Sequence, residues 1–205
     1  MIAGRIASVF GALALAGCST LPDTSTYVPP PQGSTWTSQL KLSGSYGSGA
    51  PRVTTTMSMH RWQDRDVLAF KTPNGAILAK HDGCWIAQLA GAEPLITWDP
   101  DVCGQRPYNI GQTHTRPFKA TNHRTKRTFD VEGRWTIEAY EAIDVPAGQF
   151  HAFRMRYTDN LGNDNLDWTV PELGIFVKSR RTRGANHPQG PGTFESELVS
   201  HTIRR

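Results

Sequence analysis

The chain has 205 residues, of which 22 are Lys or Arg and 18 are Asp or Glu, so its formal charge is +4. Without the single Arg of the first 17 residues the charge falls to about +3, which is too small an excess to indicate a nucleic-acid partner. A chain of this length suits one domain with a substantial core.

Residues 1–17 have the organisation of a signal peptide. Arg5 precedes an apolar run, from Ile6 to Leu15, that is too short to span a bilayer. The segment ends in Leu15-Ala16-Gly17-Cys18, which resembles the lipobox of bacterial lipoproteins and implies cleavage before Cys18 and acylation of that residue. Because Ser19 and not Asp follows, we expect an anchor on the periplasmic side of the outer membrane. The alternative is an ordinary secretory peptide with an incidental Cys.

Residues 18–34 are predicted to be the lipidated Cys and a Pro-rich tether. The stretch contains three consecutive prolines and little to bury, so we expect it to run extended and to hold the domain clear of the membrane. Residues 35–205 are expected to form a single β domain.

From residue 35 the chain carries short runs rich in β-branched and aromatic residues, separated by turn signals. Asn74-Gly75 predicts a type I′ hairpin, whereas Pro94, Pro100 and Pro107 predict an irregular stretch over residues 90–108. The strands predicted before that stretch are residues 36–44, 52–62, 66–72, 76–81 and 84–89.

Cys84 and Cys103 form an even pair once Cys18 is assigned to lipid, and an exported protein lies in an oxidising compartment. We therefore expect a structural disulfide, which would stabilise the fold by about 3 kcal/mol in the chain-entropy model. The alternative is a redox or nucleophilic pair, although the sequence has no C-x-x-C motif.

The second half predicts longer strands, at residues 125–133, 134–145, 150–159, 165–170, 174–182 and 195–205. Gly, Pro or Asn marks turns at Glu132-Gly133, Pro146-Ala147-Gly148, Asn160–Asn163 and Pro171–Gly174. A helix is hard to place anywhere in the chain. The expected fold class is all-β, a single antiparallel curved sheet in the form of a half-barrel or sandwich, with little helix.

No constellation predicts a catalytic, metal or cofactor site, so we expect a protein that is not an enzyme. The loop after Asp159 is rich in oxygen donors, but Leu161, Asp164 and Val170 occupy the third, sixth and twelfth positions of a calcium loop. The seven histidines occur singly, and no Gly-x-Ser-x-Gly motif is present. We interpret Glu172 as an exposed turn residue and not as a catalytic carboxylate.

Two basic clusters lie within residues 116–127 and 178–187. Either could attract an anionic envelope partner, or could protect strand edges against aggregation. The six Trp and eight Phe could line an apolar cavity or form the core. The candidate anionic-partner patch consists of Arg116, Lys119, Arg124, Lys126 and Arg127.

Two stretches, VPAGQFHAFRMRY at residues 145–157 and WTVPELGIFVKS at residues 168–179, resemble a motif pair of bacterial envelope proteins. The pair is V-P-A-G-x-F followed by W-x-x-P-x-x-G-x-x-V-K. It is found in families of domains of unknown function, including TapB-like proteins, and is distantly similar to the lipoprotein-carrier fold of LolA and LolB. The resemblance implies a curved antiparallel sheet whose concave face accepts a hydrophobic ligand, and it implies no catalytic residue.

These features predict an outer-membrane-anchored periplasmic lipoprotein with a non-enzymatic binding or scaffold role. Its expected partners are the membrane, through the anchor, and an unknown envelope protein or lipid. The alternatives are a carrier or chaperone for a hydrophobic ligand or lipoprotein and, third, an envelope hydrolase.

Overall fold

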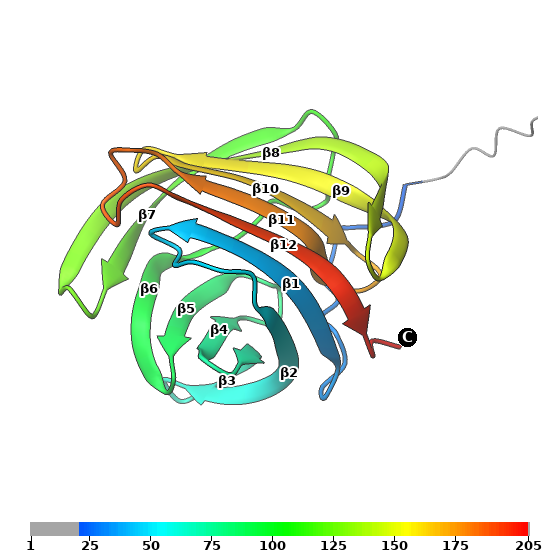
Figure 1. Ribbon diagram of the computed structural model, residues 1–205, viewed down its shortest axis with the longest axis horizontal. Coiled ribbons are helices and arrows are strands. Elements are labelled where there is room, and N and C mark those ends of the chain that lie inside the picture. The colour runs from blue at the N-terminus through cyan, green and yellow to red at the C-terminus, as the bar shows by residue number, and fades with distance from the viewer. Residues whose placement is uncertain (1–20, 205) are drawn as a thin grey trace, which may run out of the picture.

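The computed structural model describes residues 21–204, and over these residues the chain forms twelve antiparallel strands in a closed barrel (Figure 1). Each strand pairs with its neighbours in the chain, and β1 also pairs with β12. Within the same residues no helix has the length and apolar character needed to cross a bilayer. The strands are β1 (Thr35–Gly44), β2 (Arg52–Trp62), β3 (Arg65–Thr72), β4 (Gly75–Ala79), β5 (Trp85–Ala90), β6 (Glu93–Val102), β7 (Thr113–Asn122), β8 (Arg127–Val145), β9 (Gly148–Asp159), β10 (Asn163–Val170), β11 (Ile175–Arg183) and β12 (Gly192–His201).

The all-β, antiparallel prediction is confirmed, but the sheet is neither a half-barrel nor a sandwich. The ladder that closes it runs from Trp36, opposite His201, to Gly44, opposite Gly192. An open sheet would leave the backbone N–H and C=O groups of β1 and β12 unpaired at its edges, whereas a closed barrel pairs them.

The barrel is curved unevenly. In Figure 1, β2–β6 curl tightly, while β8–β12 form a broader arch. Val67, Leu68 and Ala69 on β3 are at most 1% exposed, and successive strand residues point to opposite faces. Both faces of β3 are therefore covered. Val67 and Ala69 belong to one core cluster, and Leu68 belongs to another, against which Tyr27 packs.

A further core cluster forms where the β8–β9 hairpin meets β10, β11 and β12. Val145 of the hairpin packs in one cluster with Val170, Ile175 and Leu198. Ala147 in the turn donates its backbone N–H to the carbonyl of Leu198 at 3.0 Å. The turn predicted at Pro146-Ala147-Gly148 is therefore present, and it folds back onto β12.

The turn predicted at Glu132-Gly133 is wrong. β8 runs through this dipeptide as one strand of 19 residues, so the two strands expected there are one. A Cβ on Gly133 would lie 2.6 Å from the ring of Trp135 and 2.9 Å from the ring of Tyr157. The glycine therefore makes room for two aromatic rings and does not reverse the chain.

The irregular stretch expected over residues 90–108 contains strand β6. Pro94 and Pro100 both lie in this strand. The ladder between β6 and β7 is short, from Ile96 to Asp99. Because proline has no N–H to donate, the prolines limit the length of this ladder without preventing the strand.

The hairpin between β3 and β4 is confirmed, but its turn is not of type I′. Thr72 pairs with Gly75, so the two central residues are Pro73 and Asn74. Neither has the positive φ that type I′ requires, since proline fixes φ near about −65°. Gly75 instead allows β5 to approach closely, because a Cβ there would lie 2.0 Å from the carbonyl oxygen of Leu89 on β5.

Candidate functional site

One end of the barrel, which we call the near end, is covered by the N-terminal segment, residues 21–34. Thr24 is 2% exposed. Its hydroxyl accepts a hydrogen bond from the backbone N–H of Tyr108 at 2.6 Å. The hydroxyl of Tyr27 donates to the carbonyl of Gly174 at 2.9 Å. The segment is thus held to the stretch after β6 and to the turn after β10.

A tether that extends away from the domain was predicted over residues 18–34. The described part of it instead packs against the barrel. The ring of Tyr27 packs against the core cluster that contains Leu68. It also lies over Gly83, where a Cβ would come within 2.9 Å of the ring. A proline-rich composition predicts an extended backbone, and an extended backbone can dock on a barrel as well as span a gap. Cys18, the predicted lipidation site, lies outside the described residues.

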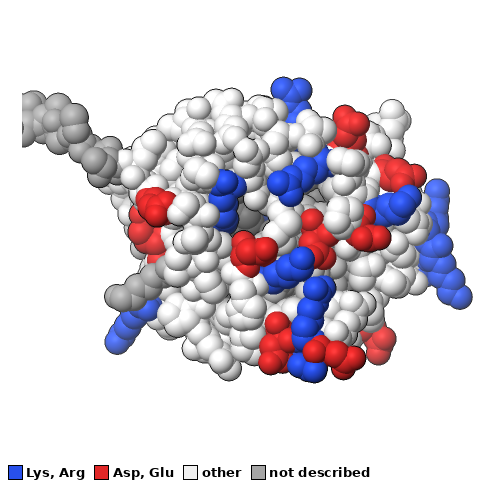
Figure 2. Space-filling view, turned by 180° about the vertical axis from the view of Figure 1, so that it is seen from behind, with Lys and Arg blue, Asp and Glu red and all other residues white. Residues whose placement is uncertain are grey.

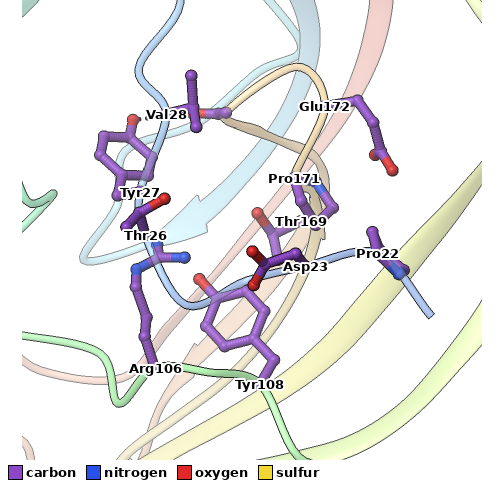
Figure 3. A pocket seen from close by; sticks show the side chains of 11 residues that line it. Pro22, Asp23, Thr26, Tyr27, Val28, Arg106, Tyr108, Thr169, Pro171 and Glu172 are labelled. Carbon is purple, nitrogen blue, oxygen red and sulfur yellow. Dashed lines mark hydrogen bonds between the residues drawn. The ribbon is translucent and has the colours of Figure 1, made fainter.

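A cleft of about 170 Å³ opens between the N-terminal segment and the barrel. Figure 3 shows the guanidinium of Arg106 beside the rings of Tyr27 and Tyr108. The guanidinium carbon lies 5.0 Å from the first ring centroid and 4.6 Å from the second. Burial raises the pKa of Tyr108 above its ordinary value, so its hydroxyl stays protonated at neutral pH. Asp23 and Glu172 also line this cleft.

Glu172 lies in a four-residue turn between β10 and β11, and it is exposed. The carbonyl of Val170 accepts hydrogen bonds from the N–H groups of Leu173, at 3.0 Å, and Gly174, at 2.9 Å. Gly174 has φ of 68°. The turn interpretation of this stretch is therefore confirmed.

Cys84 and Cys103 are joined by a disulfide. Cys84 directly precedes β5 and Cys103 directly follows β6, beside the pair formed by Trp85 and Val102. Cys103 lines a second cleft, of about 190 Å³. The bond therefore joins the ends of two strands that already pair, which is a structural position.

The second cleft is lined by aromatic and charged side chains, among them Trp135 and Arg116. Lys80 and Asp101, also in its lining, form an ion pair. His114 stacks on Trp135 with ring centroids 5.2 Å apart. Burial and the nearby charge of Arg116 lower the pKa of His114, so its imidazole is neutral at pH 7. This histidine is thus a packing residue beside the cleft.

The candidate anionic-partner patch divides into two parts. Arg124 and Lys126 lie in the turn between β7 and β8, and Arg127 begins β8; all three are exposed. Arg116 lies on β7 and lines the second cleft. Lys119 pairs with Asp130 at 2.6 Å, and this pairing raises the pKa of Lys119. The structure therefore brings three of the five residues together, and we call these three the basic turn.

The basic turn lies at the end of the barrel opposite the N-terminal segment, which we call the far end (Figure 1). β7 has ten residues, which span about 30 Å along a strand. In Figure 2 Lys and Arg side chains project at the right-hand edge, on the side of the far end. Elsewhere on that face basic and acidic side chains are interspersed.

Two of the four Lys and Arg side chains in the second basic cluster form ion pairs. Lys178 pairs with Glu197 at 2.7 Å, and Arg181 pairs with Asp167 at 3.2 Å. The guanidinium of Arg183 lies 3.9 Å from the ring centroid of Tyr46. These contacts fix neighbouring parts of the barrel to one another, so Lys178, Arg181 and Arg183 have a structural role, whereas Arg180 is exposed.

In the described part of the chain, no group of three or more His, Cys, Asp or Glu side chains is arranged to hold a metal ion. Asp159, at the start of the donor-rich loop, uses its carboxylate to build the loop. It accepts hydrogen bonds from the N–H groups of Leu161 and Asn163, both at 3.0 Å. The hydroxyl of Tyr157 donates to its other oxygen at 2.7 Å.

Large aromatic side chains meet one another inside the fold. Trp36 contacts Phe70 with ring centroids 6.0 Å apart. Trp85 on β5 contacts Phe176 on β11 at 6.3 Å, and these strands are not neighbours in the sheet. The second contact therefore joins opposite walls of the barrel, as core residues do. The two clefts described above are each smaller than the roughly 300 Å³ at which small-molecule sites begin.

No protein-family model matches the sequence, and no curated protein sequence matches it. The resemblance to TapB-like proteins and to the carriers LolA and LolB therefore stays an expectation.

Three solved structures are similar to the barrel. The hypothetical lipoprotein YmcC from Escherichia coli has 15% identity and a TM-score of 0.45, over 83% of this chain and 84% of that one. A provisionally named lipoprotein from Parabacteroides distasonis has 9% identity and a TM-score of 0.46, over 88% and 100%. A provisionally named exported protein with a YmcC-like fold, from Bacteroides fragilis, has 14% identity and a TM-score of 0.48, over 87% and 99%. Similarity at this level carries no argument about function.

Proposed function

We propose that the protein is a lipid-anchored protein of the cell envelope with a non-enzymatic binding or scaffold role, held on the periplasmic side of the outer membrane. The observation that carries the proposal is the packing of the N-terminal segment. The lipobox-like residues end at Cys18, and by Thr24 the chain is buried against the barrel. The anchor would thus hold the barrel in a defined orientation.

The distance from the anchor to the barrel follows from the chain length. Thr24 is the sixth residue after Cys18, and six extended residues span at most about 20 Å. The near end of the barrel would therefore lie close to the membrane and the far end would point into the periplasm. Several acyl chains on one cysteine would make this attachment firm.

The far end then presents the basic turn to the periplasm. Arg124, Lys126 and Arg127 are exposed there, and clustered cations attract anionic surfaces. A negatively charged envelope protein or lipid is the partner class that this surface fits. A carrier role is less well supported, because neither described cleft has the volume of a small-molecule site.

The use of carboxylates inside the fold supports a role without catalysis. Asp167 accepts a hydrogen bond from the hydroxyl of Ser179 and pairs with Arg181. Glu141 accepts a hydrogen bond from the indole of Trp168 at 2.9 Å and pairs with Arg154. These acids are engaged in holding strands together, whereas a general acid or base needs access to a substrate.

The proposal is tested by crosslinking in intact cells, with a photoreactive residue at Thr125 in the basic turn. We expect adducts with an envelope protein or lipid, and their loss when Arg124, Lys126 and Arg127 are changed to Glu. The same photoreactive residue at Ser48, an exposed far-end position outside the basic turn, is the control. Equal adducts from Thr125 and Ser48, or recovery of a stoichiometric acyl ligand from inside the barrel, would contradict the proposal.

A further inference from the structure

We propose that the near end of the barrel is a second membrane contact, which lies on the headgroup region of a phospholipid bilayer through Leu21, Val28 and Ile110. The inference rests on the proposed acylation of Cys18, and it adds a contact surface of the folded barrel to that anchor.

The exposed hydrophobic side chains are gathered at this end. Among the described residues, the large hydrophobic side chains that are exposed are Leu21, Val28 and Ile110, at 51%, 49% and 50%. Single exposed hydrophobics are ordinary, but a group of them marks an interaction surface.

The two segments that carry these side chains are joined by one hydrogen bond between distant parts of the chain. Leu21 and Val28 flank Thr24, whose hydroxyl accepts the backbone N–H of Tyr108. Ile110 follows Tyr108 by two residues. The docked N-terminal segment and the stretch after β6 therefore share one surface.

Chain length selects the bilayer as the occupant of this surface. Leu21 is three residues from Cys18, so the two residues can be separated by at most about 11 Å. The headgroup region on each side of a bilayer is about 5–8 Å thick. A barrel attached by acyl chains at Cys18 would therefore hold Leu21 in the headgroup region or only a few ångströms beyond it.

Arg106 is the polar group of the near end that suits a bilayer interface. It is half-buried, and its guanidinium lies against the rings of Tyr27 and Tyr108. An Arg side chain can lay its stem along apolar surface and keep its charge at headgroup level, whereas Tyr108 is 7% exposed and serves as packing. Asp23 and Glu172 line the same cleft, so the local charge is mixed. The contact would therefore depend on apolar insertion and not on anionic lipid.

The test uses the full acylated protein in vesicles of phosphatidylethanolamine and phosphatidylglycerol that contain a phospholipid with a photoreactive acyl chain. Adducts are mapped to peptides by mass spectrometry, and the intact mass reports the acylation of Cys18. We expect adducts on the peptides that contain Leu21, Val28 and Ile110, at similar yield in low and high salt. Changing these three residues to Asn should lower the yield of lipid adducts on these peptides by about tenfold or more.

A matched control changes two exposed far-end alanines, Ala50 and Ala185, to Asn, and should leave the yield unchanged. An unchanged thermal midpoint in both variants shows that the barrel is intact. Adducts spread evenly over the barrel, or concentrated on residues 122–127, with Cys18 acylated, would overturn this inference and leave the anchor standing. A Cys18 without acyl chains would overturn the anchor, and with it the basis of the inference.

Discussion

Gly174 and Glu172, both in the turn after β10, differ in how strongly the fold restricts the residue type at their positions. Gly174 has φ of 68°, a conformation that β-branched residues adopt only with strain, whereas Glu172 is exposed. We expect Gly174→Val to lower the free energy of unfolding by about 1–3 kcal/mol, and Glu172→Gln to change it by less than about 0.5 kcal/mol. Urea unfolding measures both changes. A Glu172→Gln protein that is stable but loses its crosslinked partner would show that Glu172 has a role beyond the turn.

Gly133 is limited by its neighbours and not by its backbone conformation. A Cβ there would meet the rings of Trp135 and Tyr157 at under 3 Å, whereas a Cβ on Gly104 would meet nothing within 4 Å. We expect Gly133→Ala to destabilise the barrel by about 1–3 kcal/mol through overpacking, and Gly104→Ala to have almost no effect. Equal unfolding midpoints in urea would mean that the two rings move aside at little cost.

These residues show which individual roles can be predicted from sequence. The partnership of Cys84 and Cys103 follows from counting cysteines, and the turn at Glu172 follows from the adjacent Pro and Gly. Gly133 was misinterpreted because glycine serves both at turns and where rings approach a backbone, and local sequence does not distinguish the two. The basic turn was predicted as part of a larger patch, because sequence proximity does not show that Arg116 lines a cleft.

At the level of elements, the N-terminal segment is held in part by one buried hydrogen bond. Thr24→Val keeps the shape of the side chain but leaves the N–H of Tyr108 without its acceptor. We expect a loss of about 1–3 kcal/mol, the cost of an unsatisfied buried donor. Thr26→Val, at an exposed position of the same segment, is the control and should be nearly neutral. The measurement is thermal unfolding; a midpoint unaffected by Thr24→Val would mean that the segment contributes little to the fold.

Runs rich in β-branched and aromatic residues between turn signals predicted most of the strands, because such side chains favour the extended backbone and turn residues bound each run. β6 and β7 were both missed. The prolines of β6 are read as breaks, although two prolines can lie in one strand when its ladder is short. The packing of residues 24–34 was missed for a related reason. The buried residues of this segment include Thr24 and Pro30. Threonine and proline are not residue types that predict a core position from composition.

For the whole molecule, attachment and folding should be separable. We expect Cys18→Ala to move the protein from the membrane to the soluble periplasmic fraction, because the proposed lipid attachment site is removed while every described core contact remains. Cell fractionation and the thermal midpoint of the purified protein measure the two properties. Continued membrane association of the Cys18→Ala protein would show that acylation of Cys18 is not what holds it there.

Closure of the barrel could not be predicted from the sequence, for a physical reason. Turn residues specify which neighbouring strands pair, but the contact of β1 with β12 has no turn between them. An open, curved sheet and a ring share the same strands and the same hairpins. The difference lies in one ladder between the first and last strands.

That ladder sets an order of events in biogenesis. β12 is the last strand in the chain, so the ring cannot close until it is present. If the protein crosses the inner membrane from its N-terminus, as the proposed function requires, β1 would keep one unpaired edge until β12 arrives. An exposed edge can pair with other chains and aggregate. The period of greatest risk for this protein would therefore be the interval between the arrival of β1 and the arrival of β12, when a periplasmic chaperone would have most to protect.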